Sequence, residues 1–152
     1  MEIEDSYDLL CVKGVEGSFA FEFATVKEIC ADLQISKMPC LPPYFIGVCN
    51  YKGEIVPILA PEGSEVKEEK SVIIIFGYQE YQLGILYYGE PYILEAESCE
   101  AIQEPENGTE SEDGIWVEKK LVRAGDEIVT VLDMEKIILN LARYFREEYL
   151  GY

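Results

Sequence analysis

The chain has 152 residues, a formal net charge of −18 and no histidine, and 49% of its residues are hydrophobic. A chain of this length buries about 70% of its unfolded surface and needs no disulfides to fold, and its apolar content argues against a disordered protein. The excess of acidic residues repels phosphate backbones and anionic membrane surfaces, which argues against a nucleic-acid-binding function.

The cysteines and the first residues indicate the compartment. No Cys-x-x-Cys occurs, and without histidine the usual zinc spacings are absent. We interpret the five cysteines as thiols in a reducing cytosol. The acidic N-terminus lacks the pattern of a signal peptide, and no apolar run is long enough to span a membrane. We therefore expect a soluble, cytoplasmic protein.

The first segments favour two paired strands followed by a short helix. Asp8–Lys13 is β-prone, and glycines at positions 14 and 17 favour a turn. Ser18–Phe23 alternates, with three phenylalanines on one face, which is typical of a half-buried strand. Thr25 and Glu28 form a Thr-x-x-Glu capping box, which predicts a short helix over Val26–Ala31.

The most informative part of the chain lies between positions 35 and 59. The apolar runs Tyr44–Cys49 and Ile55–Leu59 predict a hairpin, because Gly53 accepts a positive φ and Asn50 suits the entry to a tight turn. The proline at position 57 restricts the second strand to a sheet edge, or to a place where its missing donor is harmless. Lys52 is expected at the exposed tip, which favours docking over catalysis.

The next segments predict further strands. Ala60–Lys70 is charged and is interpreted as a solvated connection between two lobes. Val72–Phe76 is a continuous apolar run, typical of a strand buried on both faces. It turns into Tyr81–Tyr87, where Gly84 indicates a bend or bulge, and Tyr92–Leu94 follows. This plan repeats that of residues 8–23, which favours two similar barrels.

Residues 95–114 are the most acidic segment, and we interpret them as a mobile, solvated loop. A calcium loop places its ligands at alternating positions with a glycine at the sharp turn, and that order is missing here. An alternative interpretation is an acidic small-molecule-binding module or a hydrolase that uses this loop. It requires an apolar pocket with convergent carboxylates beside the loop.

The last segments predict two strands and a helix. The strands Ile115–Leu121 and Ile128–Leu132 precede Asp133, which is a good N-cap because its carboxylate accepts free amides of the first helical turn. Apolar residues then recur at helical spacing from Met134 onward, and Gly151 is expected as the C-cap. We expect this helix to cover the open edge of the first barrel; the alternative is that its far end holds a partner.

The sequence contains no motif for a reactive centre. Without histidine, the Ser-His and Cys-His arrangements cannot form. Neither of the glycine-rich phosphate-binding patterns occurs, and no carboxylate pair is flanked by a motif that places it in a cleft. We therefore expect a non-catalytic binding module, with no metal and no cofactor.

The hairpin residues resemble the CheW-like domain, which is found in the bacterial chemotaxis coupling protein and in the regulatory domain of its kinase. Gly47-Val48, Asn50, Lys52-Gly53 and Ile55–Ile58 are similar to the family pattern G-(V/I)-x-N-L-R-G-x-(I/V)-(V/I)-P-(V/I). Three further blocks resemble the family's V-Q-E-I helix, its R-x-V-G-L strand and its L-V-I-L-L-D-L-D-K-L ending, namely Val26–Ile29, Tyr81–Ile85 and Ile128–Ile137. The likeness spans roughly residues 7–140.

The resemblance implies an all-β fold with short helices, built from two SH3-like five-stranded β-barrel lobes that share a hydrophobic core, with the C-terminal helix packed on the first lobe. Residues 1–152 then form one CheW-like domain, with lobe 1 at about 7–60 plus 133–150 and lobe 2 at about 70–132. It also implies an adaptor that couples chemoreceptor cytoplasmic tips to the regulatory domain of a histidine kinase. Such an adaptor does no chemistry and is recruited to membrane-associated receptor arrays. The acidic charge and the short apolar runs described above argue that it binds no nucleic acid and does not insert into the membrane.

The family's docking residues correspond to Val26 and Glu28 on the short helix and to Asn50, Lys52 and Gly53 at the hairpin tip. The chain departs from the family where Lys52 replaces an arginine, because lysine cannot make the same two-pronged contact. The sequence also departs from the family pattern directly after the second hairpin strand and in the segment that begins at Trp116. Two alternatives therefore stay open: a CheW-fold scaffold that serves a different signalling system, and a homo-oligomeric scaffold.

Overall fold

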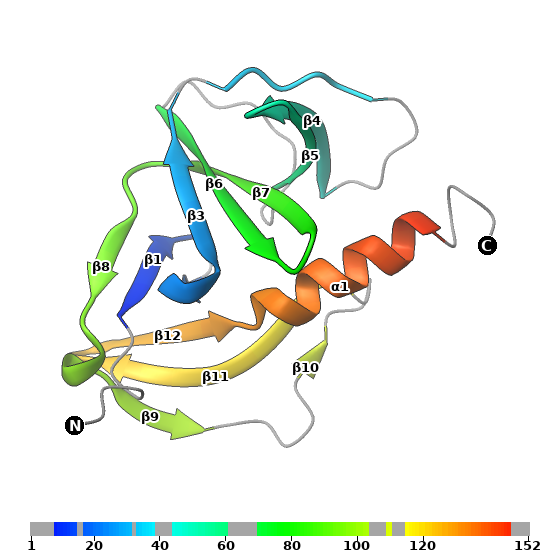
Figure 1. Ribbon diagram of the computed structural model, residues 1–152. Helices are drawn as coiled ribbons and strands as arrows, with labels where there is room; N and C mark the ends of the chain where they lie inside the picture. Colours follow the sequence, from blue (N-terminus) through cyan, green and yellow to red (C-terminus); the bar gives the residue numbers. More distant parts are fainter. Residues whose placement is uncertain are drawn as a thin grey trace, which may run out of the picture. The chain divides into compact units, whose positions relative to one another are not determined.

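Figure 1 shows a computed structural model of residues 1–152. The structure describes residues 8–14, 17–31, 33–38, 44–60, 70–103, 109–110 and 115–146. These residues form two β-sheets and one α-helix, as the all-β prediction requires. They divide into two compact units, one within residues 26–90 and the other within residues 1–25 and 91–152.

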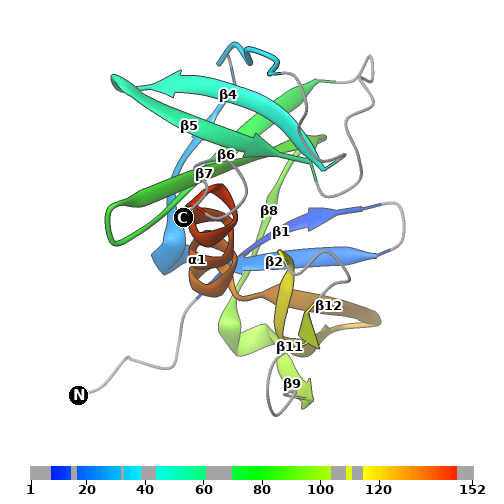
Figure 2. The ribbon, with the colours of Figure 1, turned by 90° about the vertical axis from the view of Figure 1, so that its right-hand side faces the viewer.

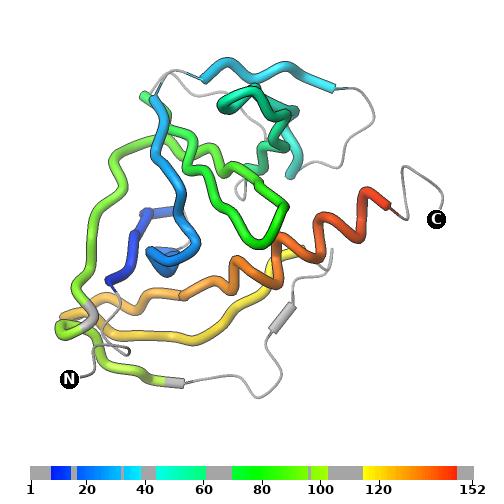
Figure 3. Tube along the Cα trace, in the orientation of Figure 1, coloured from blue at the N-terminus to red at the C-terminus, as the bar shows by residue number. Residues whose placement is uncertain are grey.

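The unit within residues 26–90 is a five-stranded sheet in the order β3-β6-β7-β5-β4. All neighbours are antiparallel except β5 and β7. Its core combines Cys49, Tyr51, Val56, Ile58, Ile73 and Ile75. Figure 1 labels the strands, and the trace in Figure 3 follows the chain through them. Their bounds are β3 Val26–Cys30, β4 Phe45–Tyr51, β5 Glu54–Leu59, β6 Ser71–Tyr78 and β7 Tyr81–Tyr88.

The predicted helix over Val26–Ala31 is wrong, because this segment is strand β3. Both the capping box and the resemblance to the family's V-Q-E-I helix pointed to it. The β-branched Val26 and Ile29 favour an extended backbone, and β3 gains a ladder with β6 that a six-residue helix could not replace. Thr25 instead ends the short 3-10 helix Phe23–Thr25, where its hydroxyl donates to the carbonyl of Glu22 at 2.7 Å.

The predicted hairpin is confirmed as β4 and β5, which Figure 2 shows in cyan. Pro57 is tolerated because the backbone groups of Val48, its partner on β4, bond to Ser36 instead, and because the ladder to β7 begins only at Ile58. Gly84 does not mark a bulge between β6 and β7, since their register runs through it without a shift. A Cβ at Gly84 would lie 2.7 Å from Ile58 Cδ1, so the glycine permits close side-chain packing.

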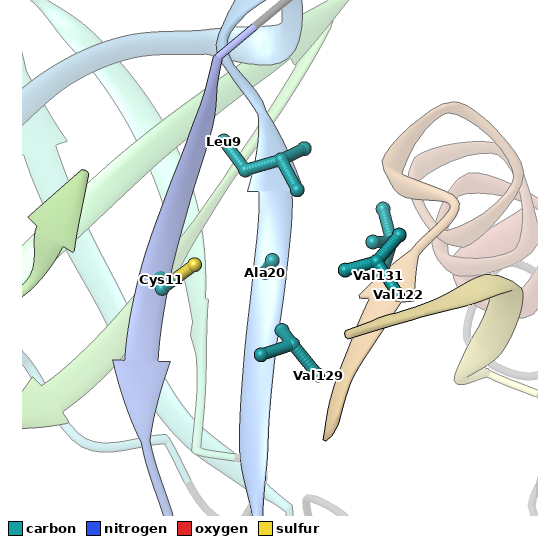
Figure 4. Packing of buried hydrophobic residues seen from close by; sticks show 6 residues of the cluster. All are labelled: Leu9, Cys11, Ala20, Val122, Val129 and Val131. Carbon is teal, nitrogen blue, oxygen red and sulfur yellow. The ribbon is translucent and has the colours of Figure 1, made fainter. Parts of the chain in front are cut away.

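The other unit contains a seven-stranded sheet in the order β10-β11-β12-β2-β1-β8, with β9 also paired to β11. Its core cluster, drawn in Figure 4, combines side chains from β1, β2, β11 and β12. A parallel ladder joins β12 to β2. The strand bounds are β1 Leu9–Lys13, β2 Ser18–Glu22, β8 Tyr92–Leu94, β9 Glu100–Gln103, β10 Thr109–Glu110, β11 Val117–Ala124 and β12 Glu127–Leu132.

The C-terminal helix, α1 Met134–Tyr144, begins at the predicted N-cap. The Asp133 carboxylate accepts from the amide of Lys136 at 3.1 Å. The predicted apolar stripe is confirmed in part, because Met134, Ile137, Ile138 and Leu141 are buried. The helix belongs to the unit that contains β1 and β2, and it contacts β11. The predicted C-cap, Gly151, lies outside the described residues.

This division of the chain differs from the predicted lobe boundaries, which grouped residues 7–60. The structure places β1 and β2 in a sheet with β8–β12, and it places the hairpin in a sheet with β6 and β7. The acidic segment 95–114 contains the 3-10 helix Ala96–Ser98 and the strands β9 and β10. Its remaining residues at 104–108 and 111–114, and the connection at 61–69, lie outside the described ranges.

Candidate partner-binding site

The two edge strands of the five-stranded sheet come together in space. The hydroxyl of Tyr51 on β4 donates to Oε1 of Glu28 on β3 at 2.7 Å. The chain that follows β3 also returns to β4, because Ser36 and Val48 exchange two backbone hydrogen bonds of 2.7 and 2.9 Å. The sheet is therefore curled into a barrel that closes between β3 and β4.

One end of this barrel is lined by polar side chains. Side chains alternate between the two faces of a strand, and the inward face is identified by the apolar core of this unit. Toward the hairpin turn, the next inward positions on β3, β4, β5 and β7 are polar or amphipathic. We call these residues, together with the neighbouring lysines, the barrel rim: Lys27, Glu28, Tyr51, Lys52, Glu54 and Gln82.

The hairpin turn fixes the position of Lys52. Lys52 and Gly53 have φ angles of 51° and 87°, so both central residues of the two-residue turn lie in the left-handed region, as in a type I′ hairpin. Asn50 supports the turn, because its Oδ1 accepts from the amide of Gly53 at 3.0 Å. The positive φ expected at Gly53 is confirmed, whereas the left-handed conformation of Lys52 was not expected from the sequence.

Lys52 returns from the turn to the carboxylate of Glu28. Its Nζ lies 3.4 Å from Glu28 Oε1, and the two side chains are 73% and 44% exposed. The same Nζ lies 5.3 Å from the centre of the Tyr51 ring, within the range of a cation–π contact. Tyr51 itself is only 7% exposed. The side chains of Tyr51 on β4 and Lys52 in the turn thus converge on one carboxylate oxygen of Glu28 on β3.

The pKa values of the three groups move in the directions that this geometry requires. The hydrogen bond from Tyr51, and then the contact with Lys52, lower the pKa of the Glu28 carboxyl below its ordinary 4.5. The Glu28 carboxylate, and then Tyr51, raise the pKa of Lys52 above 10.5. The hydrogen bond to Glu28 raises the pKa of Tyr51 above 10.0, so its hydroxyl stays a donor. At neutral pH Glu28 is therefore a carboxylate and Lys52 an ammonium ion.

A second set of contacts continues around the rim. Lys27 Nζ donates to Gln82 Oε1 at 3.3 Å, and the Gln82 amide donates to Glu54 Oε1. The alkyl chain of Lys27 covers Gly77, where a Cβ would lie 2.7 Å from Lys27 Cδ. The rim therefore carries two lysines and two glutamates, and its formal charges cancel within a strongly acidic chain.

The structure brings some of the predicted site residues together. Glu28 and Lys52 form the ion pair, and Asn50 and Gly53 share the turn that presents it. Val26 lies at the start of β3 and pairs with Phe76 of β6. Sequence reasoning missed Tyr51. Tyr51 lies two positions after Cys49 on the same strand, so both side chains point to the same, inward face. This spacing is the sequence signal that could have predicted Tyr51 at the end of the barrel.

A model of the CheW-like domain family matches residues 8–141. The chain belongs to the CheW-like domain family. A solved structure, the scaffolding protein TtCheW from Thermoanaerobacter tengcongensis, has a TM-score of 0.65 and 19% sequence identity, over 84% of this chain and 89% of that one. None of the curated proteins matches the chain.

The family match and the structural likeness agree with the predicted fold of two SH3-like subdomains. Within the described ranges, no three histidine, cysteine, aspartate or glutamate side chains gather as a metal site. No helix among the described residues has the length and apolar character needed to cross a membrane.

Proposed function

We propose that this protein is a cytoplasmic adaptor that couples the cytoplasmic tips of chemoreceptors to the regulatory domain of a chemotaxis histidine kinase. Family membership supports a scaffolding role, and the solved relative is itself described as a scaffolding protein. The observation that carries the proposal is the exposed Glu28–Lys52 pair, which the hairpin turn presents at the rim of the five-stranded barrel.

The proposed binding residues divide into contacts and supports. Glu28 and Lys52 meet the partner, because their charged ends are exposed. Asn50 and Gly53 hold the turn in its left-handed conformation, and Val26 anchors β3 beside Phe76. An exposed ion pair contributes little to folding stability, so the value of this one lies in specificity and in the registry of the complex.

Binding measurements test the proposal directly. The full chain is titrated with a chemoreceptor cytoplasmic fragment and, separately, with the kinase regulatory domain, by calorimetry at micromolar concentration. We expect both binary complexes, and a ternary complex in sedimentation when all three proteins are mixed. If neither partner binds at micromolar concentration, the adaptor proposal is wrong. Self-association of the chain alone would favour the homo-oligomeric scaffold.

A further inference from the structure

Two cysteines lie opposite each other where the five-stranded barrel closes. In the strand order β3-β6-β7-β5-β4, every ladder except β5–β7 is antiparallel, so the outer strands β3 and β4 run antiparallel to each other. The hydrogen bond between Glu28 and Tyr51 sets their register across the seam. Cys30 is two residues further along β3 and Cys49 is two residues back along β4, so these two residues occupy the next opposite positions on the same face.

Both thiols point into the barrel. Cys30 pairs with Ile73 on β6, Cys49 pairs with Val56 on β5, and residues paired across a ladder share a face. Ile73, Val56 and Cys49 belong to the core cluster of this unit, and Cys30 packs against that cluster. The two thiols are also close enough to interact electrostatically, because burial, then the Glu28 carboxylate and then Cys49 raise the pKa of Cys30.

The seam between the two strands is not closed by a backbone ladder within the described ranges. On one side of the thiols it is held by the hydrogen bond from Tyr51 to Glu28, and on the other side by the backbone bridge between Ser36 and Val48. The two strands can therefore adjust to the Cα separation of about 4.4–6.8 Å that a disulfide requires. A bond between the thiols would join the strands between these two contacts.

The two thiols differ in their access to solvent. Cys49 is 2% exposed, whereas Cys30 is half-buried. Cys30 is therefore the thiol that a small molecule reaches first, and Cys49 is placed to react with the group that Cys30 then carries. Burial, and then the Glu28 carboxylate, raise the pKa of Cys30, so at neutral pH its thiol stays protonated and reacts slowly. In a reducing compartment the pair rests as two thiols.

We propose that Cys30 and Cys49 form a redox-sensitive pair, which a low-molecular-weight disulfide links across the seam and a thiol reductant releases. The Cys30 thiolate attacks one sulfur of the small disulfide, whose S–S bond breaks and releases one small thiol. Cys49, as its thiolate, then attacks Cys30 Sγ, which breaks the mixed disulfide and releases the second small thiol. The two cysteines lose two electrons and two protons, and the small disulfide takes up both as its two thiols.

The other neighbouring pair of thiols, in the second unit, is less suited to this exchange. Cys11 lies in the core cluster of Figure 4, and Cys99 packs against that cluster. Burial, and then the charges of Cys99 and Glu127, raise the pKa of Cys11 to about 12. Cys11 therefore supplies almost none of the thiolate that the exchange needs. We expect the reaction to be selective for the seam.

The full chain tests this proposal without a partner protein. Reduced protein is incubated with oxidised glutathione at about pH 8.5, near the ordinary pKa of a thiol, and the remaining thiols are then blocked in denaturant. Mass spectrometry is expected to show that two cysteines escape blocking, and digestion with trypsin and chymotrypsin to yield two peptides joined through Cys30 and Cys49. Chymotrypsin cuts after Tyr44 and so separates Cys49 from Cys40.

Several other products would overturn the proposal. One is a disulfide that joins Cys30 or Cys49 to Cys40, and another is a link between Cys11 and Cys99 in place of the link across the seam. A stable mixed disulfide of glutathione on Cys30, which Cys49 does not resolve, would overturn it as well. A chain that stays fully reduced would have the same consequence.

Thermal melts measure the effect of the bond on the barrel. The disulfide closes the loop from Cys30 to Cys49 and restricts the unfolded chain, so we expect the melting temperature to rise by about 5–10 °C and to fall back when dithiothreitol is added. We expect Cys30→Ala to abolish this rise, whereas Cys40→Ala, a matched change between the two cysteines in sequence, preserves it. A rise that survives Cys30→Ala would place the bond elsewhere and overturn the proposal.

The influence of Glu28 is tested through the reaction rate. Glu28→Gln removes a charge that raises the pKa of Cys30, and we expect the disulfide to form about threefold faster. Glu54→Gln, the same change on β5, is the control and leaves the rate unchanged. Equal rates in both variants would refute the effect of Glu28 on the thiol. Because these measurements need neither receptor nor kinase, their failure would leave the adaptor proposal standing.

Discussion

Two contacts between a tyrosine and a glutamate, one in each unit, show how the same chemistry serves two purposes. In the unit within residues 26–90, the Tyr51 hydroxyl donates to Glu28 at 2.7 Å. In the other unit, the Tyr92 hydroxyl donates to Glu127 at 3.2 Å, and the second oxygen of Glu127 accepts from the hydroxyl of Ser18.

The difference lies in the third member of each network. Ser18 is buried, so the second network joins β2, β8 and β12 and is completed inside one sheet. Lys52 is exposed, so the first network ends in a cation that meets solvent. A tyrosine–glutamate pair is thus enclosed in the fold where buried Ser18 completes it, and it holds an exposed charge for the proposed partner contact where Lys52 completes it.

The largest effect is expected from Lys52→Glu. Reversing the charge places a second carboxylate beside Glu28, and we expect receptor or kinase affinity to fall about 100-fold with a nearly unchanged melting temperature. Calorimetric titration and thermal melts measure the two quantities. The matched control is Lys119→Glu, which reverses the lysine of the 2.9 Å pair with Glu22. Equal losses of affinity in both variants would remove the distinction between the two units.

Glu127→Ala tests the structural network. The change leaves the hydroxyls of Ser18 and Tyr92 without their common acceptor, and we expect a loss of about 1–3 kcal/mol in the free energy of unfolding. Urea denaturation measures this loss, while partner affinity at the rim stays the same. A normal unfolding free energy, or a selective loss of binding, would show that the Glu127 network is not structural.

Two glycines at positive φ sharpen the comparison further. Gly53 in the hairpin turn and Gly125 in the β11–β12 turn have φ angles of 87° and 65°, and a Cβ at either would meet open space. Alanine at each position is therefore expected to cost about 1 kcal/mol through backbone strain alone. Only Gly53→Ala should also weaken partner binding, because its turn carries Lys52. Urea denaturation and calorimetry on the two variants test this, and equal binding by both would mean that the turn geometry is unimportant.

The smallest effect is expected from pH. The folded-state pKa of Glu28 is lowered, so its stabilising contact is present above 4.5 and is lost as pH falls through the lower folded value. The pKa of Lys52 is raised, so its contact is present below 10.5 and is lost as pH rises through the higher folded value. The chain has no histidine. We expect partner affinity to change less than about twofold between pH 5.5 and 8.5. A steep change in that window would point to a titrating group on the partner.

Local sequence patterns correctly predicted the elements that are determined by residues close together in the sequence. The hairpin follows from its glycine and its two apolar runs, β6 from an uninterrupted apolar segment, and the start of α1 from Asp133. The helix predicted over Val26–Ala31 failed because pairing with β6, a contact between residues far apart in sequence, outweighs a capping box. The grouping of strands failed for the same reason, since the parallel ladders β2–β12 and β5–β7 have no local signal.

The binding site was predicted in the same partial way. The family resemblance gave Glu28 and Lys52 as separate docking residues, and the structure joins them in an ion pair. Tyr51 was missed because a tyrosine between Asn50 and Lys52 is expected only to flank the turn, and nothing in the sequence indicates that its hydroxyl contacts Glu28. The contact between Tyr51 and Glu28 depends on the curvature of the sheet, which brings β3 close to β4. No local sequence pattern predicts that curvature.

The left-handed backbone of Lys52 has a consequence for any attempt to engineer this protein. Asparagine or glycine adopts that conformation with less strain than lysine. A design procedure that rewards thermal robustness alone would therefore exchange the apex lysine for one of them. The product would withstand heat better and would have lost the Lys52 charge that we propose contacts the partner.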